Sequence, residues 1–246
     1  MSARVTSLLR RWLGRASGEA MPPDFDAPAA EIIRAVRPYT MTSHERVFSL
    51  IEAVRYVAGA GIPGSFVECG VWRGGSMMAA ALTLRERSNT DRELYLFDTF
   101  EGMSAPSEHD VAIDGKSAAA LLQAPRSTAA DSAWCYATLP DVQAALERTG
   151  YPEGRIHYVQ GRVEDTLPER APRPIALLRL DTDWYESTRH ELEHLWPLLS
   201  PGGVLIVDDY GHWDGARRAV DEYFDSSAEP VLLSRIDYTG RLAIKH

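Results

Sequence analysis

The apolar positions of this chain fall into short runs that alternate with segments of helical periodicity. Because each run is nearly continuous in apolar residues, it predicts a strand that is buried on both faces. The five predicted strands are Ser65–Cys69, Leu94–Phe97, Ile156–Val159, Ile175–Leu180 and Val204–Val207. Strands that alternate with helices indicate an α/β fold, in which helices cover both faces of a mostly parallel sheet.

The helical segments begin at recognisable sequences. Thr42-Ser-His-Glu45 and Thr188-Arg-His-Glu191 are typical of capping boxes, so we expect a helix to begin at each. Pro197 should kink or shorten the second of these helices. Further helices are predicted over SMMAAALTLRER, Asp141–Arg148 and Ala216–Phe224. At the end of the chain, the segments VLLSRID and RLAIKH predict an antiparallel hairpin at one edge of the sheet.

Two regions do not follow the alternating pattern. Residues 1–36 are expected to form an N-terminal amphipathic helix and a linker over 17–30, ahead of one domain at 37–246. Residues 102–138 have no clear period and are predicted to be a long insertion that forms a lid. In residues 1–15, apolar side chains share one helical face and arginines carry the charge. Contact with a membrane surface is one interpretation of this helix, and a subunit contact or a frayed terminus are the alternatives.

Composition narrows the class of protein. The net charge of −9 argues against nucleic acid as a partner, because a phosphate backbone would be repelled. Two cysteines are too few for a disulfide framework, so we expect a cytoplasmic protein. No apolar run approaches the length that spans a bilayer. We also expect a homo-oligomer.

The segment FVECGVWRGGS, Phe66–Ser76, joins a predicted strand to a predicted helix through a glycine-rich turn. Gly74 and Gly75 are expected to leave room for a ligand near the start of that helix. The spacing of the segment differs from both the dinucleotide-binding fingerprint and the P-loop. Asp98 follows the next strand, at about the distance where an acid accepts hydrogen bonds from ribose hydroxyls. The turn together with Asp98 predicts a nucleoside cofactor without a bridging pyrophosphate, with a plain packing turn as the alternative.

Paired aspartates end two of the predicted strands, in IALLRLDTDWY and GGVLIVDDY. Ligands of parallel sheets bind beyond the carboxyl ends of the strands, so these acids should lie together. Like charges at close range raise each other's pKa, and a divalent cation such as Mg²⁺ removes that conflict. Two metal chemistries fit. A D-x-D glycosyltransferase explains only Asp181-Thr-Asp183, whereas a methyltransferase also explains the glycine turn and Asp208-Asp209.

The segments ECGVWRGGS, LFDTFEGM, LLRLDTDWYEST and PGGVLIVDDYGHWDGARRAVDEYF together resemble the macrocin O-methyltransferase family. These enzymes are S-adenosylmethionine-dependent and methylate sugar hydroxyls of natural products. The resemblance covers residues from about Arg37 to the last strand. It implies a class I methyltransferase fold, Rossmann-like, with a seven-stranded sheet, Mg²⁺ dependence, and a sugar or glycosylated natural product as the acceptor.

The resemblance also implies roles for individual residues. Asp181, Asp208 and Asp209 would ligate the metal, and Asp98 would hold the ribose hydroxyls. The other cofactor contacts would be Thr40 and Met41 at the sulfonium end, Glu68, Gly70 and Ser76 at the methionine part, and Gly161 and Glu164 near the adenine.

The catalytic base is expected among residues beside the metal motifs. Asp183 is the first candidate because a regular strand would place it on the same side as Asp181. His212 is the second, with a surface-loop role as its alternative. Trp184 and Trp213 could form walls for a sugar or simply pack. A methyltransferase-like module that only binds the cofactor is the non-enzymatic alternative.

Overall fold

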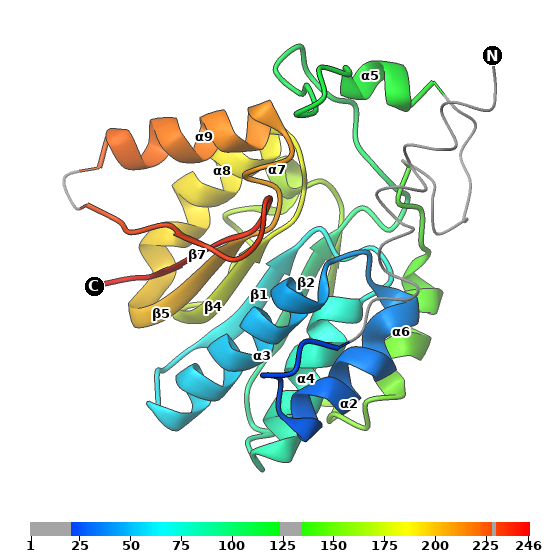
Figure 1. Ribbon diagram of the computed structural model, residues 1–246, viewed down its shortest axis with the longest axis vertical. Coiled ribbons are helices and arrows are strands. Elements are labelled where there is room, and N and C mark those ends of the chain that lie inside the picture. The colour runs from blue at the N-terminus through cyan, green and yellow to red at the C-terminus, as the bar shows by residue number, and fades with distance from the viewer. Residues whose placement is uncertain (1–20, 124–133, 228–229) are drawn as a thin grey trace.

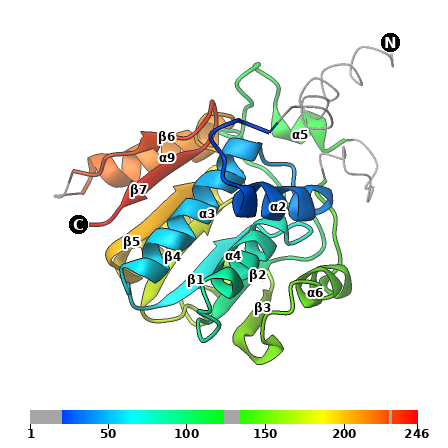
Figure 2. The same cartoon turned by 60° about the horizontal axis from the view of Figure 1, so that its bottom comes forward.

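The computed structural model of the protein describes residues 21–123, 134–227 and 230–246. Its centre is a seven-stranded sheet in the order β3-β2-β1-β4-β5-β7-β6 (Figure 1). β1 to β5 pair in parallel, whereas β7 pairs antiparallel with both β5 and β6. Figure 2 shows this terminal hairpin at the sheet edge beside α9. The predicted α/β class with an antiparallel edge hairpin is confirmed.

The strands lie where the apolar runs predicted them, with small changes at their ends. β1 spans Ser65–Cys69 and β4 spans Ile175–Leu180, as expected. The remaining strands are β2 Leu94–Asp98, β3 Ile156–Gln160, β5 Leu199–Val207, β6 Ser234–Arg235 and β7 Arg241–Ile244. β5 begins earlier than predicted, because Ser200-Pro-Gly-Gly203 continues the strand although it carries no apolar signal.

Helices cover both faces of the sheet, which explains why the strands are apolar throughout. One face packs against α2 Ala27–Val36, α3 His44–Gly59, α4 Gly75–Glu86 and α6 Leu139–Glu147. The other packs against α8 Tyr185–Leu195 and α9 Asp214–Asp225. Neighbouring strand residues alternate between the two cores, so Phe66 faces α3 and α4 while Val67 faces α8. The short helices α5 Ala118–Leu121 and α7 Val163–Thr166 lie in connecting segments.

Both predicted capping boxes are placed wrongly. α3 begins one residue later than expected, and the side chain of Ser43, not Thr42, accepts the hydrogen bond from the N–H of Arg46. α8 begins at Tyr185, so Thr188 and Glu191 lie buried inside it. Its N-cap residue Trp184 makes no side-chain cap. Instead Asp110, from the insertion, accepts the N–H of Tyr185 at 2.8 Å, a tertiary contact that no local sequence pattern reveals.

Two other sequence predictions have mixed outcomes. Residues 27–30, expected in a linker, form the first turn of α2, which Asp26 caps, and Ala29 and Ala30 are buried in the core. The effect of Pro197 is confirmed, since α8 ends at Leu195 and a 3-10 turn follows at Trp196–Leu198. The predicted membrane-surface helix at 1–15 lies outside the described residues. Among the residues that are described, no helix is both long and apolar enough to cross a membrane.

Candidate active site

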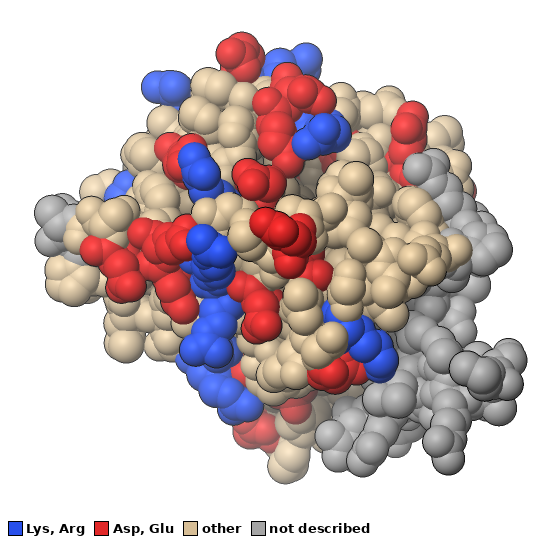
Figure 3. Space-filling model, turned by 90° about the horizontal axis from the view of Figure 1, so that it is seen from above, with Lys and Arg blue, Asp and Glu red and all other residues tan. Residues whose placement is uncertain are grey.

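Three carboxylates meet where β4 and β5 end. Asp181 follows β4, and Asp208 and Asp209 follow β5, the neighbouring strand in the sheet. Each offers an oxygen within 4.8 Å of those of the other two. Asp208 and Asp209 are buried and Asp181 is partly buried. The prediction that the strand ends bring these residues together is therefore confirmed, and Figure 3, which looks down on the molecule from above, shows acidic side chains gathered near the middle of the face.

A buried arginine, which the sequence reading missed, lies within this acidic cluster. Arg179 of β4 is 3% exposed. Its Nη1 donates to Oδ2 of Asp181 and to Oε1 of Glu68, each at 2.7 Å. Its Nη2 lies 2.7 Å from Oδ1 of Asp208. One guanidinium therefore connects carboxylates at the ends of β1, β4 and β5. Two buried carboxylates and a third partly buried one this close would otherwise repel one another strongly.

A second arginine approaches the cluster from α3. Arg46 donates through Nη1 to Oδ2 of Asp208, and its Nε lies 3.1 Å from Oδ2 of Asp237. Asp237 belongs to the turn between β6 and β7, where it also accepts the hydroxyl of Ser43 at 2.7 Å. Thr239 of the same turn donates its hydroxyl to the backbone oxygen of Asp208 at 2.6 Å. The terminal hairpin is thus fixed against the end of β5.

Burial dominates the electrostatics of the acids. It raises the pKa of Asp181 and of Asp209 above the ordinary range, and the neighbouring carboxylates raise both further. It also raises the pKa of Glu68 to about 7, against the lowering effect of Arg179. Oδ2 of Asp209 is buried and has no hydrogen-bond partner in the described part of the chain. A buried carboxylate oxygen without a partner is costly, and a bound cation would remove that cost.

Asp183 reaches the same cluster through an unusual backbone turn. The N–H of Trp184 donates to the carbonyl of Thr182 at 2.8 Å, and Asp183 between them has φ +67. The expectation that a regular strand would align Asp183 with Asp181 is wrong, because β4 ends at Leu180. The turn nevertheless brings the carboxyl group of Asp183 close to Asp209 and Trp213. Burial, and then the charge of Asp181, raises the pKa of Asp183 to about 7.

The DTD turn is held from behind by α8. The hydroxyl of Thr182 donates to Oε1 of Glu191 at 2.9 Å. Glu191 is fully buried, and burial raises its pKa well above the ordinary value for a glutamate. Its other oxygen, Oε2, has no hydrogen-bond partner within the described residues. The residue that the sequence suggested as part of a helix cap is therefore a support for the segment between Asp181 and Asp183.

The glycine-rich turn is fitted closely to its neighbours. Gly70 has φ +81, and a Cβ there would lie 2.0 Å from the backbone oxygen of Asp181. Only glycine lets β1 leave the sheet this close to the end of β4. Asp98 accepts backbone N–H groups of Val71 and Trp72 at 2.6 and 3.1 Å through one oxygen, and that of Phe100 at 2.7 Å through the other. Asp98 thus organises the turn, and its contact with a ribose stays a prediction.

The start of α4 brings together further predicted cofactor residues. Gly74 and Gly75 do not leave space for a ligand as expected. A Cβ at Gly74 would meet Leu146 at 2.8 Å, and one at Gly75 would meet the backbone of Tyr39 at 2.5 Å and the side chain of Thr40 at 2.7 Å. Thr40 is therefore packed on the first turn of α4, which contains Ser76; both side chains are buried, and Met41 beside them is partly exposed.

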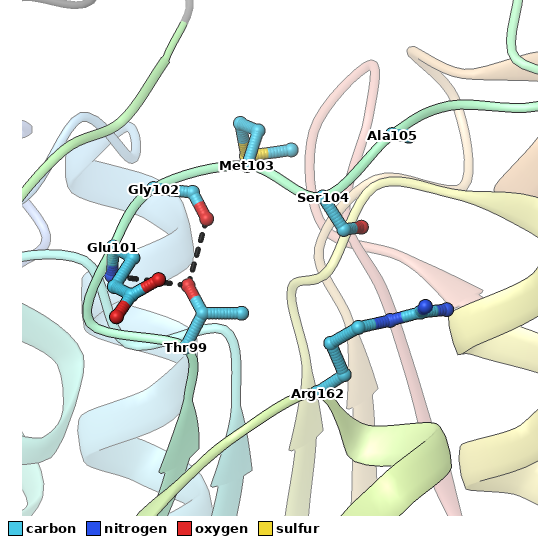
Figure 4. Close-up of a pocket in the computed structure, with 7 residues that line it drawn as sticks. All are labelled: Thr99, Glu101, Gly102, Met103, Ser104, Ala105 and Arg162. Atoms are coloured by element: carbon cyan, nitrogen blue, oxygen red, sulfur yellow. Dashed lines mark hydrogen bonds between the residues drawn. The ribbon is translucent and has the colours of Figure 1, made fainter.

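Gly161 and Glu164 lie beyond β3, next to the end of β2. The N–H of Gly161 donates to the backbone oxygen of Asp98 at 3.0 Å, and Glu164 lies in α7. A pocket of about 260 Å³ opens beside them. Figure 4 shows Thr99 and Arg162 on two sides of this pocket, with the segment 101–105 running over it. Its lining residues are Thr99, Glu101, Gly102, Met103, Ser104, Ala105 and Arg162.

His212 and the two tryptophans lie on the side of the cluster nearest the insertion. The rings of Trp184 and Trp213 contact edge to face with centroids 4.9 Å apart, and both are buried. Trp184 donates its indole N–H to the backbone oxygen of Ser104 at 3.1 Å, so the pair also holds the insertion. Burial lowers the pKa of His212 to about 4, and its ring lies 4.9 Å from that of Trp213.

Of the residues that the sequence reading missed, Arg179 left the clearest signal. It is the one charged residue within the otherwise apolar run IALLRL. A charge in a strand buried on both faces is rare unless it is paired, so its position pointed to an acidic partner. Arg46, Asp110 and Asp237 left no comparable signal, because each acts across the fold on a residue remote in sequence.

Known proteins resemble this chain over most of its length. Residues 25–243 match the family described as Macrocin-O-methyltransferase (TylF). A tetracenomycin C rhamnosyl 4'-O-methyltransferase from Streptomyces olivaceus is 37% identical over 82% of this chain and 74% of its own length. Demethyldecarbamoylnovobiocin O-methyltransferase from Streptomyces niveus is 34% identical over 80% of this chain and 73% of its own length.

Solved structures give the same result for the fold. The O-methyltransferase NovP superposes with a TM-score of 0.74 at 26% identity, over 99% of this chain and 98% of that chain. The calicheamicin methyltransferase CalS11 superposes with a TM-score of 0.64 at 20% identity, over 99% of this chain and 93% of that chain. The chain therefore belongs to the macrocin O-methyltransferase family and is an S-adenosylmethionine-dependent O-methyltransferase with the class I fold.

Proposed function

We propose that this protein is a Mg²⁺-dependent O-methyltransferase that methylates a hydroxyl on the sugar part of a glycosylated natural product. The observation that carries this proposal is the group of Asp181, Asp208 and Asp209 beside the glycine-rich turn. The names of two relatives support the acceptor class, because one acts on a rhamnosyl group and another is a mycinamicin III 3''-O-methyltransferase. A D-x-D glycosyltransferase, the alternative enzyme, is not supported, since the matching family and these relatives are methyltransferases.

The donor set of the cluster fits a hard divalent cation. Its three candidate ligands are all carboxylates, which Mg²⁺ accepts and zinc rarely takes without His or Cys. Oδ2 of Asp209 is buried and has no hydrogen-bond partner among the residues that the structure describes, so it can serve as a ligand, whereas both oxygens of Asp208 also meet arginines. When bound, such a cation makes a neighbouring sugar hydroxyl more acidic at neutral pH.

Asp183 is proposed as the group that receives the proton of the acceptor hydroxyl. Its side chain lies beside Asp209, and its backbone is held in a left-handed conformation that is unfavourable for a residue other than glycine. Strained backbone at a site commonly persists because it aims a side chain. The support from Glu191 through Thr182 keeps that conformation in place. His212 is the reserve candidate, because it lies next to Trp213 at the same edge of the cluster.

The cofactor is proposed to lie along the carboxyl ends of β1, β2 and β3. Glu68, Gly70 and Ser76 would face its methionine part, and Thr40 and Met41 would close over its sulfonium end. Asp98 would bind the ribose, with Gly161 and Glu164 near the adenine in or beside the pocket of Figure 4. Methyl transfer is a direct displacement, so the chain needs only to align the sulfonium methyl with the acceptor oxygen and to remove the proton.

The proposal is tested by comparing two variants with the wild-type enzyme. The assay supplies S-adenosylmethionine, Mg²⁺ and a panel of rhamnosides and other deoxyhexosides, and detects the methylated sugar by mass spectrometry. Asp209→Asn should weaken Mn²⁺ or Mg²⁺ binding in calorimetry and regain part of its activity in excess metal. Asp209 is preferred to Asp208 because substituting Asp208 would also remove one carboxylate partner from each of two arginines.

Asp183→Asn should bind cofactor and metal normally but lose about 10²- to 10⁴-fold in kcat, with no rescue by metal. Loss of metal binding in Asp183→Asn with retention in Asp181→Asn would show that ligand and base are reversed. Full wild-type activity in EDTA would refute the metal-dependent mechanism.

A further inference from the structure

Two exposed apolar side chains lie at the edge of the acidic cluster, each at the tip of a tight turn. Ile113 of the insertion is 65% exposed, and Tyr238 between β6 and β7 is 44% exposed. They are far apart in sequence, yet both contact His212, three residues after Asp209. We call Ile113 and Tyr238 the apolar rim.

The turn that carries Ile113 is fixed in place. The N–H of Gly115 donates to the carbonyl of Ala112 at 2.7 Å, which closes the turn around Ile113 and Asp114. Turn tips normally carry Gly, Asn, Asp, Ser or Pro, so an exposed isoleucine there has no local structural purpose. The N–H of Ile113 donates to the carbonyl of His212 at 2.8 Å, and Ala112 forms a β-bridge with Trp213. The isoleucine is therefore held beside the loop that follows the metal motif.

The turn that carries Tyr238 is anchored even more directly. Asp237 accepts the N–H groups of Thr239 and Gly240 at 2.9 and 2.7 Å, which stabilises the turn. The N–H of Gly211 donates to the carbonyl of Thr239 at 2.9 Å. A Cβ on Gly211 would lie 1.8 Å from the backbone oxygen of Tyr238, so the two segments are in close contact. Oη of Tyr238 lies 3.4 Å from Nδ1 of His212.

The cations near the rim are engaged within the chain. Arg241, beside the Tyr238 turn, donates to the backbone oxygens of Asp237 and Gly240. Lys116, next to the Ile113 turn, is paired with Asp114 at 2.5 Å. Arg46, below the Tyr238 turn, is paired with Asp208 and Asp237. The adjacent cluster is itself acidic. An apolar surface beside engaged cations and an acidic cluster favours an uncharged, apolar ligand over a nucleoside diphosphate.

We propose that Ile113 and Tyr238 bind the apolar aglycone of the acceptor while its sugar lies at the carboxylate cluster. This inference rests on the proposed function, and it assigns specificity to two residues outside the cofactor and metal motifs. The N–H of Ile113 donates to the carbonyl of His212, and the N–H of His212 donates to that of Asp209, so the rim is bonded to the segment that follows the cluster. It follows that the reaction that joins the sugar to the aglycone precedes this methylation.

The test measures binding and turnover with three probes that share one sugar. They are 4-methylumbelliferyl α-L-rhamnopyranoside, methyl α-L-rhamnopyranoside and thymidine diphosphate rhamnose. Binding of the first is followed by fluorescence anisotropy and of the others by competition. Ile113→Ser and Tyr238→Ala should each lower the affinity for the aryl glycoside by about 3- to 10-fold, because each removes one apolar contact. The affinity for the methyl glycoside should fall less. Tyr238→Phe should retain the aryl affinity, which separates the ring from its hydroxyl contact with His212.

Two matched variants serve as controls. Tyr56→Ala removes a tyrosine of α3 that is 41% exposed and lies beside Gly202, and Leu232→Ser removes a leucine that is 78% exposed. Both should leave aryl affinity unchanged. The proposal for the apolar rim would be refuted if Ile113→Ser and Tyr238→Ala bound the aryl glycoside as tightly as the wild type does. It would also be refuted if the wild type bound thymidine diphosphate rhamnose more tightly than the aryl glycoside. Rim-dependent binding of the aryl glycoside without methyl transfer to any probe would instead count against the proposed function.

Discussion

Nη2 of Arg179 lies 2.7 Å from Oδ1 of Asp208, so a residue within one buried strand neutralises a proposed metal ligand at the end of the next. The same guanidinium holds Asp181 and Glu68. Although burial opposes its charge, Asp181, Asp208 and Glu68 raise the pKa of Arg179 further. The site is therefore organised by a fixed internal cation before any other positive charge arrives.

Arg179→Met should show how much the fold depends on this cation. Because the change leaves buried carboxylates unpaired, we expect it to lower the free energy of unfolding by about 3–5 kcal/mol in urea titrations. Mg²⁺ should raise the unfolding midpoint of the variant more than that of the wild type, since it replaces the missing charge. Arg55→Met, which removes a more exposed set of ion pairs, should cost at most about 1 kcal/mol. Equal losses in the two variants would contradict this account.

Asp98→Ala should lower the affinity for S-adenosylhomocysteine by about 10- to 100-fold in calorimetry, because the change removes a charged hydrogen-bond acceptor. Because Asp98 also binds the N–H groups of Val71 and Trp72, part of this loss comes from the turn itself. An analogue of the cofactor product without ribose hydroxyls separates the two effects. The wild type should discriminate against that analogue and the variant should not. Equal discrimination by both proteins would rule out the ribose contact.

Asp110→Ala should loosen the part of the insertion that precedes α5. Asp110 accepts the N–H of Tyr185 at 2.8 Å and both the N–H and the hydroxyl of Ser107 at 2.6 and 2.9 Å. Loss of this cap should lower the free energy of unfolding by about 1–2 kcal/mol. It should also speed proteolytic cutting between residues 103 and 118, which mass spectrometry can monitor. Asp114→Ala, an exposed acid of the same segment, is the control. If cutting there does not accelerate in Asp110→Ala, the segment is held by its other contacts.

Glu191→Gln should change how stability depends on pH. Burial raises the folded-state pKa of Glu191, so the unfolded chain loses this proton at lower pH than the folded protein. The free energy of unfolding of the wild type therefore decreases as the pH rises above about 4.5, the ordinary pKa of a glutamate. That of the glutamine variant does not, because glutamine does not titrate. Gln can still accept the hydroxyl of Thr182. Urea midpoints should be similar at pH 4.5 and favour the variant at pH 8. A constant difference across that range would show that Glu191 does not titrate this way.

The sequence by itself determined the framework and the chemistry of the strand ends. Apolar runs such as Ile175–Leu180 predicted strands because a strand buried on both faces must be apolar throughout. The position of Asp181, Asp208 and Asp209 just after such runs was enough to place them together, because parallel strands end at one edge. These inferences needed only periodicity and the geometry of a parallel sheet.

Only the tertiary structure decided how that site is held and aimed. Arg46 and Asp110 act on residues far away in sequence, so no local pattern could reveal that they hold Asp208 and the start of α8. Aspartate tolerates the left-handed conformation of Asp183, but the end of β4 and the support of Glu191 place it there. Gly74 likewise appeared to make room for a ligand, but Leu146 fills that space. Long-range packing sets such details because the contacts that fix them exist only after the chain has folded.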